Sequence, residues 1–247
     1  MAIKELSFAW AYSFADRVVD EVRAPEAVCV LDFLEPREST FIEKAAHPSQ
    51  ATLLHSFIYN LNASDLDYST GHFPEESIET YVSILHSAHL DVPDWLCEEE
   101  SGNHIAELDR LLDRAARAIT DATFHLLFSD REFLAAFQSL IADKLVATNP
   151  EASSDIFVRP GVLRRPSRLP SWLRRAIFLR DKGRCQSCFS DLTGTLVLDP
   201  KMHLDHIRPL AQSGSNDPTN FQLLCKSCNL KKGPIEGGHI FRTVTYW

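Results

Sequence analysis

Two short stretches of the same pattern decide the C-terminal fold: Cys185-Gln186-Ser187-Cys188 and Cys225-Lys226-Ser227-Cys228. Between them lie 36 residues, 189 to 224. Two such pairs supply four thiolates, the number that closes a tetrahedral shell around Zn²⁺ and ties the intervening loop at its base. The pattern predicts a structural zinc site at Cys185, Cys188, Cys225 and Cys228. A redox dithiol and a chance pairing are the alternatives.

The loop between the cysteine pairs carries residues suited to hydrolysis of a phosphodiester. The segments Met202–Leu210 and Asn220–Leu224 alternate or run apolar over four to six residues, which predicts two short strands joined by a turn-rich hairpin loop. Asp205 offers a hard oxygen ligand for Mg²⁺ or Mn²⁺, and the amide oxygen of Asn229 offers a second. His206 is the candidate general base, because an unperturbed imidazole pKa of about 6.5 leaves much of it neutral at physiological pH.

On these residues, the segment from about 171 to 235 resembles an HNH endonuclease of the zinc-knuckle type. The resemblance rests on the stretches 180–188, 204–210 and 220–233. It implies a ββα-metal fold that cuts nucleic acid, usually DNA, with one divalent ion. It also assigns Asp205 and Asn229 to the catalytic metal, His206 to the general base, and Asn220 to the catalytic motif as the residue that holds the hairpin loop and so orients the base.

Basic residues beside the motif are expected to hold the substrate backbone, with little reading of bases. Lys232 matches a frequent basic position near the phosphates in the family, and Arg208 and Lys231 are given the same role. Residues 156–247 carry 15 Lys/Arg against 6 Asp/Glu, whereas residues 1–155 carry 10 against 28. A basic C-terminal third favours DNA as a partner, and uneven solvated surfaces are the alternative.

The N-terminal part of the chain shows the periodicity of helices. Apolar residues recur every three or four positions, for example from Ile105 to Leu126 and from Phe133 to Leu145, with a break near Ser129-Asp130. Residues 149–170 contain four prolines and a cluster of arginines, which predicts a stiff basic linker. The expected fold class is α+β overall: an all-α domain over residues 1–148 and a small ββα-metal HNH domain with a four-cysteine zinc site over residues 171–247.

No segment is expected to cross a membrane. The longest stretch without a formal charge, residues 45–64, contains a proline and several polar side chains. The N-terminus has no basic region of the kind that begins a secretory signal, so the chain is placed in the cytoplasm.

The predicted function is a metal-dependent HNH endonuclease that hydrolyses DNA, with structural Zn²⁺ and catalytic Mg²⁺ or Mn²⁺. The alternative is a non-catalytic zinc module that binds nucleic acid, or an adaptor gated by a partner. HNH nucleases joined to extra domains resemble effectors of bacterial defence systems. By that analogy, the acidic helical domain would bind a protein partner, for example an ATPase or sensor, and residues 156–247 alone would cut more freely than the whole chain.

Overall fold

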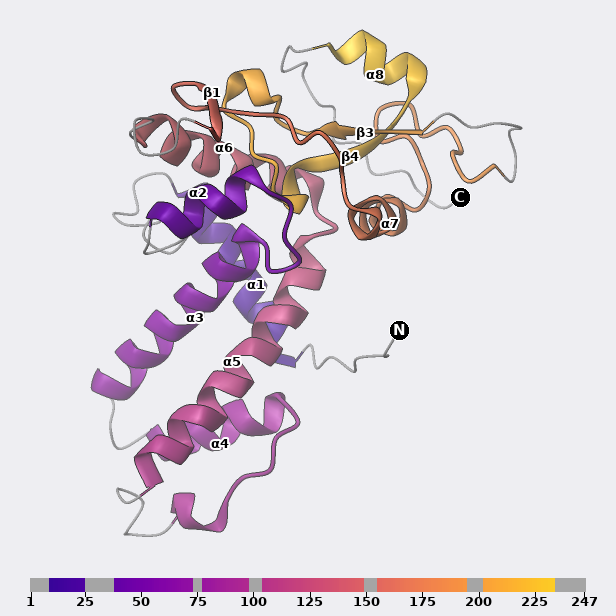
Figure 1. Cartoon of the computed structure of the whole chain (residues 1–247). Coiled ribbons are helices and arrows are strands. Elements are labelled where there is room, and N and C mark those ends of the chain that lie inside the picture. The colour runs from indigo at the N-terminus through magenta and orange to yellow at the C-terminus, as the bar shows by residue number, and fades with distance from the viewer. Residues whose placement is uncertain are drawn as a thin grey trace. The chain divides into compact units, whose positions relative to one another are not determined.

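The structure is a computed structural model that describes residues 9–24, 38–72, 77–97, 104–148, 155–194 and 202–233 (Figure 1). The N-terminal region is mostly helical, and the C-terminal region holds two small two-stranded sheets. The predicted α+β class is therefore confirmed. None of the described helices combines the length and the apolar character needed to cross a bilayer.

The chain divides into two compact units, the first of which joins residues 1–27 to residues 54–127. This unit is built from helices α1 (Ala9–Arg23), α3 (Leu53–His72, from its second residue on), α4 (Ser77–Ser87) and α5 (Ile105–Leu127), with the short 3-10 helix η3 (Asp94–Cys97). Helix α5 packs against α1 and α4. Leu85, Leu96 and Ala115 are among the buried residues between these elements, which places the predicted apolar stripe of α5 in a core.

The second unit joins residues 28–53 to residues 128–247. It contains α2 (Glu38–Ala46), α6 (Arg131–Ala147), the hairpin of β1 (Phe157–Arg159) and β2 (Val162–Leu163), α7 (Ser171–Arg180), β3 (Met202–His206), β4 (Phe221–Cys225) and α8 (Lys226–Lys232). Two 3-10 turns, η6 (Leu210–Gln212) and η7 (Pro218–Asn220), lie between β3 and β4. Helix α6 begins at Arg131, next to the break that the sequence predicts. Asp130 is its N-cap residue, since the carboxylate accepts a hydrogen bond from the Phe133 amide at 3.0 Å.

A ββα arrangement forms the C-terminal part of this unit. Strands β3 and β4 pair antiparallel, with Asp205 opposite Gln222 and His206 opposite Phe221. In Figure 1, α7 and α8 flank this hairpin, and both helices pack against β4. The side chains of α7 that face the core are Leu173 and Ile177, four positions apart and therefore on one side of the helix. Helix α7 begins at Ser171, and Pro170 occupies the N-cap position before it.

The region predicted to be an extended linker contains the β1–β2 hairpin. Phe157 and Leu163 face each other across it and are buried, and Gly161 makes the turn with a positive φ of 70°. The bounds of the compact units also differ from the predicted domain boundaries, because α2 and α6 belong with the ββα elements. Independent folding of residues 1–148 and 171–247 stays a prediction.

The hairpin loop before β4 lies in the interior of the second unit. Its polar residues Ser215, Asn216, Asp217, Thr219 and Asn220 are all fully buried. Their partners lie far earlier in the chain: the Asn216 amide donates to the Ala45 carbonyl at 2.7 Å, and Asp217 accepts from the Leu53 amide at 2.8 Å. Gln138 on α6 accepts from the Ser215 hydroxyl at 2.9 Å and donates to Thr219 at 2.8 Å. The loop is therefore a layer of buried polar groups. Its burial is tolerated because α2 and α6 supply hydrogen-bond partners for these groups.

Replacing the Gln138 side chain tests this layer. The Gln138→Leu substitution leaves the buried Ser215 hydroxyl without its acceptor, so we expect the free energy of unfolding to fall by about 1 to 3 kcal/mol. Chemical denaturation measures the change. The matched control is Asp143→Asn on the exposed side of the same helix, which should stay near the wild-type value. Equal stability of Gln138→Leu and wild type would contradict the buried layer.

Candidate active site

The four cysteines of the two CxxC pairs form one cluster. Their Sγ atoms all lie within 4.8 Å of one another, and those of Cys188 and Cys225 are 3.8 Å apart. A tetrahedral zinc site with Zn–S bonds of about 2.3 Å has sulfur–sulfur distances of about 3.8 Å. The donor set and its spacing fit Zn²⁺. The cluster supports the structural zinc predicted from the sequence.

Backbone hydrogen bonds attach both cysteine pairs to the ββα core. The Phe189 amide donates to the Cys185 carbonyl at 2.7 Å, which closes the first knuckle, and the Gln186 amide donates to the Leu223 carbonyl of β4 at 2.9 Å. Cys225 ends β4 and caps α8, with its sulfur accepting from the Cys228 amide at 3.4 Å. Burial alone would raise the pKa of the Cys225 thiol, but hydrogen bonds with Ser227 and with the Cys228 amide lower this pKa to about 6. The second knuckle thus joins β4 to α8.

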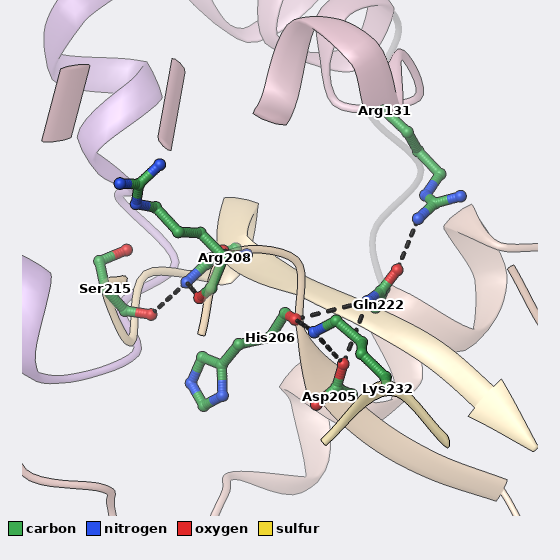
Figure 2. Close-up of polar contacts among 8 residues, drawn as sticks. Arg131, Asp205, His206, Arg208, Ser215, Gln222 and Lys232 are labelled. Carbon is green, nitrogen blue, oxygen red and sulfur yellow. Dashed lines mark hydrogen bonds and ion pairs between the residues drawn. The ribbon is translucent and has the colours of Figure 1, made fainter. Parts of the chain in front are cut away.

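Asp205 lies on β3 beside the end of α8. Its Oδ2 atom accepts hydrogen bonds from Lys232 Nζ at 2.6 Å and from Gln222 Nε2 at 3.1 Å (Figure 2). The Lys232 ammonium also donates to the His206 carbonyl. Within the described ranges, neither the Oδ1 atom of Asp205 nor the side chain of half-buried Asn229 on α8 has a hydrogen-bond partner. One carboxylate oxygen and one amide oxygen fit Mg²⁺ or Mn²⁺, which keep several water ligands.

Gln222 connects Asp205 to an arginine of α6. Arg131 Nη2 donates to Gln222 Oε1 at 2.5 Å, and Nη1 donates to the Gln186 carbonyl at 3.2 Å. Because the arginine can only donate, it sets the orientation of the Gln222 amide, so that Nε2 faces Asp205. Figure 2 shows Gln222 between the two charged groups. Burial lowers the pKa of Arg131 to about 10, so the guanidinium remains charged at neutral pH.

His206 ends β3 with its imidazole buried. The side chain packs against its cross-strand neighbour Phe221, with ring centroids 4.5 Å apart, and its Nε2 atom lies 3.1 Å from Asn216 Oδ1. In Figure 2 the ring points away from Asp205 and Lys232. Burial is the main reason that the pKa of His206 is lowered to about 4. The imidazole is therefore neutral at physiological pH, the form that can accept a proton.

Asn220 closes the hairpin loop between the two strands. Its Oδ1 atom accepts from the Arg208 amide at 2.8 Å, and its Nδ2 atom donates to the carbonyls of Arg208 at 3.0 Å and Ser215 at 2.8 Å. The Asn220 carbonyl also accepts from the Ile207 amide at 2.5 Å. One buried side chain thus joins both ends of the loop that follows His206.

The three basic residues expected to hold substrate occupy different surroundings. The Arg208 guanidinium donates to the Gln212 carbonyl at 2.8 Å and to the Ser139 hydroxyl of α6 at 3.4 Å, and it points away from Asp205 (Figure 2). Lys231 is exposed, whereas the Lys232 ammonium contacts Asp205. The structure therefore brings Lys232 to the candidate metal ligand and does not bring Arg208 there.

Three residues of the site escape the sequence analysis: Arg131, Asn216 and Gln222. Gln222 had a detectable signal, because it is the single amide within the apolar stretch from Phe221 to Leu224. Asn216 looks like an ordinary turn residue, since asparagine is common in turns. Arg131 lies 74 positions before Asp205, and no local pattern relates the two.

Removing one cysteine tests the zinc site. Cys225→Ser should lower the zinc content of the purified protein and its melting temperature together, because the free energy of metal binding contributes to folding. Elemental analysis and thermal denaturation measure the two quantities. Lys226→Gln, at an exposed neighbour in the same knuckle, is the control that should keep its zinc. A Cys225→Ser protein with one zinc and an unchanged melting temperature would contradict the assignment.

The low pKa of His206 predicts how stability changes with pH. Between the ordinary value of 6.5 and the folded value of about 4, the unfolded chain binds a proton at His206 that the folded chain does not. Lowering the pH through this window should therefore destabilise the fold, by at most about 3 kcal/mol from this group. Denaturation at pH 7 and pH 4.5 should show a smaller difference for His206→Gln than for wild type. The same difference in both proteins would refute the buried neutral imidazole.

The comparison with known proteins identifies the segment that carries this site. Residues 185–234 match the family model described as HNH endonuclease. No curated protein and no solved structure matches the chain. The matched range begins at the first cysteine of the cluster and includes the β3–β4 hairpin and α8. The family model thus identifies residues 185–234 as an HNH segment, and this range holds the cysteine cluster, the β3–β4 hairpin and α8.

Proposed function

We propose that the chain is a metal-dependent endonuclease that hydrolyses phosphodiester bonds of DNA, with His206 as general base. One arrangement carries the proposal: a neutral histidine follows directly on an aspartate at the end of β3, beside the helix that bears Asn229. The HNH family match supports nuclease activity at the level of the family. The basic charge of residues 156–247 supports a polyanionic substrate.

In the proposed reaction, His206 takes a proton from a water molecule. The oxygen of this water attacks the phosphorus in line, the bond to the 3′ oxygen breaks, and that oxygen leaves and takes up a proton from solvent. The product carries a 5′-phosphate. When bound by Asp205 and Asn229, a divalent ion would stabilise the charge on the phosphate and on the leaving oxygen. Asn220 holds the loop that follows the base.

The surroundings of the basic residues refine their proposed roles. Exposed Lys231 fits a contact with the phosphate backbone. Lys232 places its ammonium at Asp205, so it would act close to the reacting phosphate. The Arg208 guanidinium is hydrogen-bonded to Gln212 and Ser139. These bonds favour a role for Arg208 in holding the loop rather than in holding substrate.

A protein partner for the acidic region, a role in bacterial defence and a cytoplasmic location stay predictions. Shortening the chain to residues 156–247 is a poor test of restraint by the helical region, because it removes α2 and α6. These helices hold the buried loop through Ala45 and Gln138. We therefore expect the fragment to lose stability, and its activity would not report on regulation. Binding of a partner to the whole chain is the better measurement.

Cleavage of supercoiled plasmid by the whole chain tests the proposed function. With Mg²⁺ or Mn²⁺ the protein should convert the plasmid to open-circle or linear DNA, and EDTA should prevent this. His206→Gln, which keeps much of the side-chain volume, should abolish conversion and leave DNA binding in a gel-shift assay nearly unchanged. His203→Ala is the matched control on the same strand and should cut as wild type does.

Two outcomes separate the alternatives. Cleavage that needs both the metal and His206 supports the enzyme. Binding of DNA with no cleavage by a folded, zinc-loaded wild-type protein would instead favour a nucleic-acid-binding zinc module. Equal cleavage by His206→Gln and wild type would refute the assignment of the base.

A further inference from the structure

The amide of Asn216 has only one orientation that satisfies its surroundings. One of its two side-chain polar atoms lies 3.0 Å from the Ala46 carbonyl and 2.9 Å from the Arg164 carbonyl. Carbonyl oxygens only accept, so this atom must be the NH₂ nitrogen. The other atom, Oδ1, then faces the imidazole of His206, 3.1 Å from Nε2. An amide oxygen has no proton to give, so His206 Nε2 must be the donor of this bond.

In a neutral imidazole, a proton on Nε2 leaves a lone pair on Nδ1. Among the residues that the structure describes, Nδ1 has no hydrogen-bond partner. The ring of Phe221 lies against the imidazole, with centroids 4.5 Å apart and planes inclined by 38°. A half-turn of the ring would put the carbon Cε1 in the place of Nε2 and remove the hydrogen bond with Asn216, so this bond favours the orientation in which Nε2 faces Oδ1.

We propose that Asn216 is the positioning residue of His206, holding the imidazole in the Nε2–H tautomer so that Nδ1 is the atom that accepts the proton from water. This inference rests on the proposed nuclease function and deepens it. The arrangement is analogous to other sites in which a second side chain fixes the tautomer of a catalytic histidine. Here the second group is a neutral amide.

Asn216 is itself held by parts of the chain outside the HNH segment. Helix α2 ends at Ala46, so its last carbonyls have no partner within the helix. The backbone amide of Asn216 donates to the Ala45 carbonyl at 2.7 Å, and its side chain donates to the Ala46 carbonyl. Asn216 thus caps α2 and orients His206 at once. The residue after the β1–β2 hairpin, Arg164, supplies the third carbonyl.

It follows that the matched segment 185–234 does not orient its base alone. Ala45, Ala46 and Arg164 all precede it in the sequence. The end of α2 and the chain after β2 accept the hydrogen bonds of the Asn216 amide nitrogen, and the Asn216 oxygen accepts the one from His206 Nε2. Residues of the helical part of the chain therefore act on the HNH chemistry through the second compact unit itself.

The tautomer of His206 can be read directly from the ring nitrogens. The experiment uses the whole chain with zinc and without Mg²⁺ or Mn²⁺, labelled with ¹⁵N in its histidines, at neutral pH. Long-range ¹H–¹⁵N correlation spectra distinguish a protonated from a bare ring nitrogen, and the missing signals of His206→Gln assign the ring. We expect Nε2 protonated and Nδ1 bare. A proton on Nδ1, or a mixture of both tautomers in wild type, overturns the inference without any variant at Asn216.

Variants at two neighbouring positions separate positioning from loop stability. Asn216→Ala should let His206 populate both tautomers, and it should lower kcat for plasmid cleavage by roughly 10- to 100-fold with KM little changed, as is typical for loss of an orienting partner. Ser215→Ala is the matched control, because its hydroxyl bonds to Gln138 and does not touch His206. It should lose stability and keep the Nε2–H tautomer. An unchanged tautomer in folded Asn216→Ala would overturn the proposal.

Failure of the inference is distinguishable from failure of the proposed function. If wild type cuts DNA and carries the His206 proton on Nδ1, the role of Asn216 is wrong and the nuclease stands. If wild type carries the proton on Nε2 and does not cut under any metal, the proposed function is wrong, and with it the catalytic meaning of the tautomer. Cleavage with the Nε2–H tautomer, lost in Asn216→Ala and kept in Ser215→Ala, supports both.

Discussion

The hydrogen bonds of the buried loop between β3 and β4 are the constraint on which the second compact unit depends. Five polar residues of this loop are withdrawn from water, and each such group is costly unless it finds a partner. The partners come from α2, the start of α3 and α6. Since the loop directly follows His206, the same hydrogen bonds that make the burial of its polar groups tolerable also hold the residues next to His206. Stability and the geometry of the candidate site therefore have one physical origin.

The two halves of the candidate site are supported in the same way, through amide side chains of defined orientation. Gln222 presents its NH₂ group to Asp205 because Arg131 occupies its oxygen. Asn216 presents its oxygen to His206 because two carbonyls occupy its nitrogen. An amide that must both donate and accept transmits the orientation of one neighbour to the next. Helix α6 is thus linked to the aspartate through Gln222, and helix α2 to the histidine through Asn216.

The cysteine cluster has a different role from that of the buried loop. It ties the first knuckle, the end of β4 and the start of α8 at one point, and α8, the helix that bears Asn229, packs against β3, the strand that carries Asp205. A ββα unit of this size buries few apolar residues, chiefly Leu173, Ile177, Phe221, Leu223 and Leu224. A bound metal adds stability that such a small core does not supply. The cluster and the packing of α2 and α6 are therefore complementary supports of one small hairpin.

The sequence by itself determined the features that depend on local spacing. The two CxxC pairs predicted the cysteine cluster, helical periodicity predicted the break between α5 and α6, and the residues around Asp205 and His206 identified the HNH segment. The roles of Asp205, His206, Asn220 and Asn229 remain proposals. Only the tertiary structure decided that the hairpin loop is interior, that Gln222 links Arg131 to Asp205, and that Asn216 faces His206. The physical reason is that hydrogen bonds between buried polar groups join residues up to 171 positions apart, and such pairings leave no periodicity in the chain.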